Sequence, residues 1–204
     1  MSMNSLHDLY VDELKDLYSA ENQLLKALPR MAKKAAAEEL KAAFSEHVEV
    51  TRKQVERLDT IFAGLDVAPK GKKCKAMEGL IEEGKEVIEA EGHPAVIDAA
   101  LIASAQRVEH YEMAGYGCVR TFAALLGYDE AAGLLQQTLD EETKADKSLT
   151  KLAETIINIE AEGADGDEDE EEVDDEETED ETEVDDEKTA PKKAKGTMKK
   201  TVKS

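Results

Sequence analysis

Carboxylate and imidazole side chains recur at spacings that place them on the apolar faces of predicted helices. If each residue turns the helix by about 100°, Glu21 falls close to the line through Leu14 and Leu25. His47 and Glu142 fall in the same way at the centres of two later apolar stripes. Burying a carboxylate is costly unless it is protonated, paired or bound to a metal ion. These residues therefore predict a cation site inside the protein.

The candidate ligands also share a depth. In an antiparallel helix pair, residues equally far from the turn face each other. At 1.5 Å per residue, all the candidates lie roughly 20 to 28 Å from turns expected near residues 34 and 127. One inward glutamate alone could instead pair with a lysine, but four helices carrying such residues favour a metal site. The predicted ligands are Glu21, His47, Glu109, Glu112, Glu142 and Asp146. Carboxylates with one imidazole suit iron or manganese better than a metal that prefers thiolates.

Helices must position these side chains, and an apolar period of 3.6 residues predicts four long ones. They are expected over residues 6–35, 40–64, 94–126 and 134–159, with Pro29 kinking or interrupting the first. A shorter amphipathic helix is expected over residues 76–88, after a loop rich in glycine and proline.

The connections between these helices predict the architecture. The first two helices are separated by few residues, as are the last two, so each pair should form an antiparallel hairpin. About 30 residues, including the short helix, join the hairpins. A long crossover of this kind is the connectivity of a ferritin-like bundle. The predicted fold is all-α: a ferritin-like four-helix bundle with a short extra helix in the crossover.

Composition excludes several other classes. The chain has 204 residues, 4% aromatic residues, no tryptophan and a net charge of −22, which disfavours a β-rich fold and nonspecific nucleic-acid binding. There is no apolar run of about 20 residues for a membrane span, and the first residues do not resemble an export signal. With only two cysteines, the expected location is a reducing cytoplasm. Cys74, flanked by lysines, is expected at the surface.

The last segment of the chain differs sharply from the rest. Residues 161–204 contain 19 acidic and 7 basic residues and few apolar ones, so this tail is predicted to be disordered. The predicted domains are a helical bundle over residues 1–160 and an acidic, then basic, tail over residues 161–204. The tail is expected to aid solubility, or alternatively to dock a basic protein partner, or nucleic acid through its last lysines.

Four segments that carry the candidate ligands closely resemble the ferritin-like YciE/YciF family. They are residues 19–24, 44–51, 105–112 and 139–146, of which the Gln-x-x-Glu-His-Tyr-Glu string at 106–112 is the most specific. The resemblance covers residues 4–158. It implies a four-helix ferritin-like fold with a fifth short helix, a homodimer, a di-iron-type centre and an association with stress responses.

The sequence also departs from the usual ferritin pattern, in which two helices carry Glu-x-x-His. Here Glu46 and Glu49 fall on the flank or outer face, and only His47 among the histidines points inward. His110 is interpreted as a residue near the site or at a helix interface, with ligation as the alternative. Tyr116 is expected to fill a helix interface, or alternatively to lie near the metal. The site could hold one metal ion or two.

Two functional hypotheses remain open. In the first, the protein is a cytoplasmic metalloprotein that carries out oxidant- or stress-related redox chemistry with oxygen or peroxide, whether or not as an enzyme. In the second, the bundle is a non-enzymatic scaffold in stress or interaction, and the acidic tail binds a basic partner.

Overall fold

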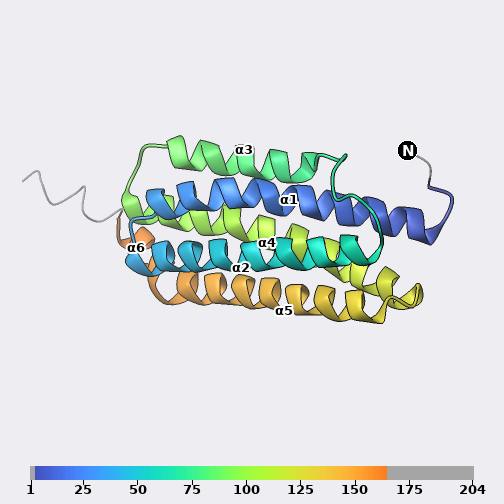
Figure 1. The fold of residues 1–204 in the computed structure, drawn as a ribbon. Coiled ribbons are helices and arrows are strands. Elements are labelled where there is room, and N and C mark those ends of the chain that lie inside the picture. Colours follow the sequence, from blue (N-terminus) through green and yellow to red (C-terminus); the bar gives the residue numbers. More distant parts are fainter. Residues whose placement is uncertain (1–2, 165–204) are drawn as a thin grey trace, which may run out of the picture. The chain divides into compact units, whose positions relative to one another are not determined.

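Four long helices lie along one another in the computed structural model, which describes residues 3–164 (Figure 1). They are α1 (Leu6–Lys34), α2 (Glu38–Gly64), α4 (Pro94–Leu125) and α5 (Asp129–Leu152). α1 packs against α2 and α4 packs against α5, while contacts of α1 with α4 and of α2 with α5 close the bundle. The described residues contain no strand, and the predicted ferritin-like four-helix bundle is confirmed.

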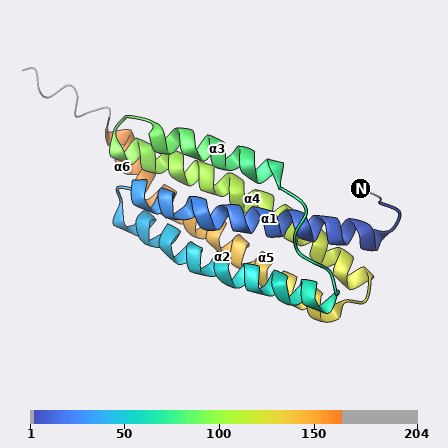
Figure 2. The same ribbon diagram turned by 45° about the horizontal axis from the view of Figure 1, so that its top comes forward.

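The crossover contains the short helix that the sequence predicts, α3 (Lys75–Glu89). α3 packs on α1 and α4, and Figure 2 shows it covering that side of the bundle, away from α2 and α5. The long connection therefore brings α4 beside α1, so that both hairpins contribute to one core.

The helix ends follow from local chemistry. Ser5 caps α1, because its hydroxyl accepts a hydrogen bond from the Asp8 backbone N–H at 3.0 Å. Pro94 occupies the first turn of α4, where its missing N–H is not needed. After α4, Gly127 adopts a φ of +77°, and the Tyr128 N–H reaches back to the Ala123 carbonyl at 2.9 Å. Such a turn sends α5 back along α4.

Two expectations about helix continuity can now be compared with the structure. Pro29 lies inside α1 and does not interrupt it. α5 continues through a π-helical turn, η1 (Ala153–Ile157), into α6 (Asn158–Gly163). The predicted domain boundary falls within α6, and nearly all of the predicted disordered tail lies outside the described residues.

A layer of buried polar residues separates two apolar clusters in the core. One cluster, which includes Leu24, Phe44 and Leu101, lies towards the α1–α2 turn. The other, which includes Tyr10 and Phe62, lies towards the α4–α5 turn. Between them, all four long helices contribute buried polar side chains: Glu21, Thr51, Gln54, Glu109, Glu112, Thr138 and Glu142.

A buried aspartate fixes the α1–α2 turn to α4. α2 has no cap from its own N-cap side chain, Ala37. Instead, the Asp98 carboxylate accepts hydrogen bonds from the backbone N–H groups of Ala36, at 2.9 Å, and Ala37, at 2.7 Å. A negative charge at a helix N-terminus is favourable. Asp98 therefore fixes the position of the first hairpin along the axis of α4, the helix that carries two of the candidate ligands.

None of the helices within residues 3–164 combines the length and apolar character that crossing a membrane requires.

Candidate metal centre

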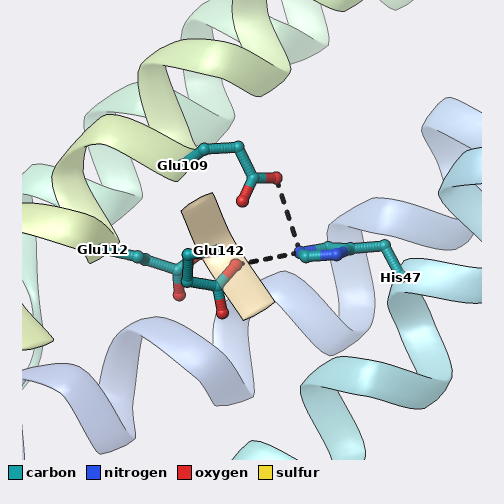
Figure 3. Close-up of side chains that lie close together, drawn as sticks. All are labelled: His47, Glu109, Glu112 and Glu142. Carbon is teal, nitrogen blue, oxygen red and sulfur yellow. Dashed lines mark ion pairs between the residues drawn. The ribbon is translucent and has the colours of Figure 1, made fainter. Parts of the chain in front are cut away.

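Four of the six predicted ligands converge in the polar layer. His47 comes from α2, Glu109 and Glu112 from α4, and Glu142 from α5. One nitrogen or oxygen atom from each residue lies within 4.8 Å of those of the others. Figure 3 shows the side chains pointing toward one another. We refer to these four residues as the His47 cluster.

The imidazole of His47 lies between two carboxylates. Its Nε2 atom is 3.4 Å from Glu109 Oε1 and 3.6 Å from Glu142 Oε2 (Figure 3). All three glutamates of the cluster are at most 3% exposed, whereas the His47 side chain is 11% exposed. Both carboxylates thus face a nitrogen atom that could share a metal ion with them.

Many polar atoms of the His47 cluster have no hydrogen-bond partner among the described residues. They are His47 Nε2, Glu109 Oε2, Glu142 Oε2 and both carboxylate oxygens of Glu112. Leaving buried polar atoms unpaired is costly. A cation would satisfy several of these acceptors at once, so the donor set fits a metal ion.

Burial raises the pKa values of the cluster's carboxyl groups. The pKa of Glu109 rises to about 7, mainly because of burial. The pKa values of Glu112 and Glu142 rise well above their ordinary range, because burial is reinforced by repulsion from neighbouring carboxylates. Without a cation, the site cannot hold all of these groups ionised. A divalent ion would favour the ionised forms.

Glu21 lies beside the His47 cluster but is not one of the four converging residues. Its carboxyl is fully buried, and it accepts a hydrogen bond from the Tyr116 hydroxyl while its second oxygen has no partner among the described residues. Burial and the nearby Glu142 raise its pKa. Glu21 thus adds a further acceptor to the same layer, next to the cluster.

Asp146 is not one of the four converging residues. Its Oδ1 atom accepts a hydrogen bond from Gln106 at 3.0 Å and lies 3.3 Å from His110 Nε2. The His110 side chain is 67% exposed, and His110 is not one of the four converging residues. Glu46 and Glu49 are exposed, as their positions on the helix predict.

A polar network behind the cluster holds Glu142. The Gln54 amide donates to Glu142 and, at 3.3 Å, to Glu141. Arg57 in turn donates hydrogen bonds to both carboxylate oxygens of Glu141, each at 2.6 Å. This bidentate ion pair fixes the orientation of the Glu141 carboxylate. The sequence places Gln54 on the same face as His47, seven residues on, but it gives no signal for the Arg57–Glu141 pair. Tyr116 is fully buried, as expected of a residue at a helix interface, and its hydroxyl donates a hydrogen bond to Glu21.

Fold and site together define a class: a ferritin-like helical bundle with a buried carboxylate–histidine cluster. Residues 5–162 match the family described as a domain of unknown function, DUF892, and the chain belongs to this family. It is 48% identical over 163 residues to protein YciF of Escherichia coli K12, covering 79% of this chain and 98% of that protein. The predicted YciE/YciF resemblance is therefore confirmed.

Solved structures agree with this assignment. The crystal structure of the E. coli stress protein YciF aligns with a TM-score of 0.74 at 48% identity, covering 76% of this chain and 99% of that one. YcfI of Rhodopseudomonas palustris, described as a candidate structural protein, aligns with a TM-score of 0.71 at 40% identity, covering 73% of this chain and 95% of that one. A Xanthomonas campestris protein with 19% identity and a TM-score of 0.62, covering 78% and 97%, shares the fold.

Proposed function

We propose that the protein binds iron or manganese at the His47 cluster and takes part in oxidant- or stress-related redox chemistry. The observation that carries the proposal is the convergence of three buried carboxylates and one imidazole on one point of the core. Several of these carboxylate oxygens have no hydrogen-bond partner within residues 3–164. The similarity of this chain to the E. coli stress protein YciF supports a role of the protein under stress.

Each residue would have a distinct part. Glu109, Glu112 and Glu142 would neutralise the cation, and His47 would supply the nitrogen ligand. Glu21 is proposed as a further ligand, which a second ion would need, and Asp146 is proposed to act at the edge of the site. A bound iron or manganese ion would supply one-electron redox chemistry and a site for oxygen or peroxide. Gln54 holds the Glu142 carboxylate in place.

Metal analysis of the chain purified without chelators tests the proposal directly. We expect one or two iron or manganese ions per chain. Electronic spectra of the anaerobically reduced protein, before and after exposure to oxygen or peroxide, should show oxidation of the bound metal. Protein that holds neither metal, even after anaerobic loading, would contradict the proposal.

A second candidate function concerns the tail. Residues 161–204 carry 19 acidic and 7 basic residues, and almost all of them lie beyond the family match, which ends at residue 162. In this alternative the bundle is a scaffold and the tail binds a basic partner. Deleting residues 165–204 would decide: loss of stress protection with unchanged metal content would favour the scaffold.

We also propose that the protein is a cytoplasmic homodimer, which the family resemblance supports. Light scattering of the purified chain measures its mass, and cell fractionation tests its location.

A further inference from the structure

A cavity of about 290 Å³ lies between α2 and α5 and reaches the His47 cluster. His47 and Glu109 line this cavity and also belong to the cluster. His47 is the most exposed member of the cluster. A molecule bound in the cavity would therefore lie next to a metal ion held by these residues.

Side chains without charge form most of the cavity wall. The apolar ones are Ala43, Phe44, Val50, Ala145 and Leu149. Pockets for drug-sized ligands usually span roughly 300–1,000 Å³, so this cavity suits a smaller organic molecule. The wall favours an apolar body, because contact with it removes apolar surface from water.

The charged residues of the cavity favour an anion. Lys53 and Lys144 line it and are exposed, as is Glu46. The fourth charged side chain of the rim, Glu141, is already paired with Arg57 at 2.6 Å. The fifth charged residue of the lining, Glu109, belongs to the His47 cluster, where a bound cation would offset its charge. With the metal bound, two lysines therefore remain against Glu46. Such a rim attracts a carboxylate.

We propose that this cavity binds a small organic carboxylate as a substrate of the metal centre. The carboxylate lies at Lys53 and Lys144, and the apolar body extends along Phe44 and Leu149 toward His47. This inference rests on the proposed function, because it names the class of molecule that is held beside the bound metal.

Hexanoate is a suitable probe for the full-length chain loaded with Co²⁺, which accepts the same ligands as Fe²⁺ and has visible absorption bands. We expect calorimetry to give a Kd on the order of 1 mM or lower. Hexanoate should also change the cobalt spectrum, because its apolar end reaches the metal site. Hexanol, which has no charge, should bind at least about fivefold more weakly.

Substitutions locate the binding site. Lys144→Glu and Lys53→Glu should each weaken hexanoate binding about fivefold without changing the cobalt content. Lys147→Glu is the matched control, because Lys147 is exposed on the same helix but does not line the cavity. Ala145→Phe should fill the cavity and abolish the spectral change. If that variant fails to fold, the lysine variants decide the question.

The outcomes separate the two proposals. A protein that binds cobalt but not hexanoate, or binds hexanol equally well, overturns the carboxylate site and leaves the metal centre intact. Equal hexanoate affinity in Lys144→Glu, Lys53→Glu and the Lys147→Glu control would also overturn the carboxylate site and leave the metal centre intact. A protein that binds no cobalt, iron or manganese overturns the metal centre itself, and the substrate site with it.

Discussion

Two polar clusters share helix α4 and differ in how their atoms are satisfied. In the first, which we call the Asp16 cluster, the Tyr111 hydroxyl donates to the Asp16 carboxylate and lies 3.0 Å from the Cys74 thiol. The other oxygen of Asp16 lies 3.4 Å from the Lys72 ammonium. Donors and acceptors are thus balanced. In the His47 cluster, three carboxylates face a single imidazole.

The difference shows which of the two clusters requires a bound cation. Balanced donors and acceptors make the Asp16 cluster complete with the protein's own atoms, so it can link α1, α3 and α4 without a ligand. The His47 cluster has an excess of acceptors and raised carboxyl pKa values. Polar groups arranged in this way stabilise the fold only when a cation joins them.

The largest expected effect comes from neutralising one acid in each cluster. Glu142→Gln should lower metal affinity more than about 100-fold, because a ligand and its charge are lost. It should also stabilise the metal-free protein at pH 8, because a neutral amide is less costly to bury than a carboxylate. Metal titration and thermal unfolding measure the two effects.

Asp16→Asn is the matched control for that substitution. It should leave metal affinity unchanged and lower the free energy of unfolding by about 1–3 kcal/mol, because it disrupts hydrogen bonds to Tyr111 and Lys72. Equal effects of the two substitutions on metal affinity would contradict the distinction between the clusters.

The next effect concerns pH. In the metal-free protein the Glu109 pKa is raised from 4.5 to about 7, so between these values the folded state binds more protons than the unfolded state. Stability should therefore fall as pH rises from 5 to 8, by on the order of 3 kcal/mol for this group. Calorimetry across this range measures the slope.

Metal should reverse this slope, because binding requires deprotonated carboxylates and so strengthens as pH rises. Protein saturated with Mn²⁺ should become more stable between pH 5 and 8. A metal-free protein whose stability rises over the same range would count against buried, unpaired carboxyl groups in the His47 cluster.

A smaller effect is expected behind the cluster. Arg57→Met removes the ion pair that fixes Glu141 and, through Gln54, supports Glu142. Metal affinity should fall about tenfold, as for other residues that orient ligands. Arg52→Met provides the control, because Arg52 is 58% exposed and, within residues 3–164, forms an ion pair with Glu49 alone. Isothermal titration of both variants with Mn²⁺ gives the comparison.

The smallest effect should come from Asp146. Because its carboxylate is directed to Gln106 and His110, Asp146→Asn should change metal affinity by less than about threefold. A loss as large as that of Glu142→Gln would mean that Asp146 turns inward and binds the metal. Metal titration of the variant distinguishes these outcomes.

The sequence predicted the helices and the convergence of His47, Glu109, Glu112 and Glu142 for a physical reason. Helical periodicity is local, and in a hairpin the distance from the turn fixes which residues face each other. Because the α1–α2 and α4–α5 turns are short, the positions of residues along each helix predict which residues face each other in the bundle. These rules needed no knowledge of side-chain conformation.

The sequence could not predict which neighbours a side chain meets. Asp146 lies one turn beyond Glu142, yet its carboxylate accepts a hydrogen bond from Gln106 and is not part of the His47 cluster. The prediction that Cys74 lies at the surface is wrong. Its thiol is fully buried, because it caps α3 by accepting the Met77 N–H at 3.4 Å and contacts Tyr111. Both outcomes depend on residues that are distant in sequence, which periodicity does not reveal.

The hydrogen bonds of Asp98 have a consequence for how the chain folds. Ala36 and Ala37 gain their partner only when α4 has docked, some 60 residues later in the chain. The first hairpin is therefore incomplete on its own, and the two hairpins are expected to form in a single cooperative transition. A fragment ending at Gly64 would lack both this anchor and three of the four residues of the His47 cluster. The site is therefore expected to assemble together with the whole bundle and not within either hairpin alone.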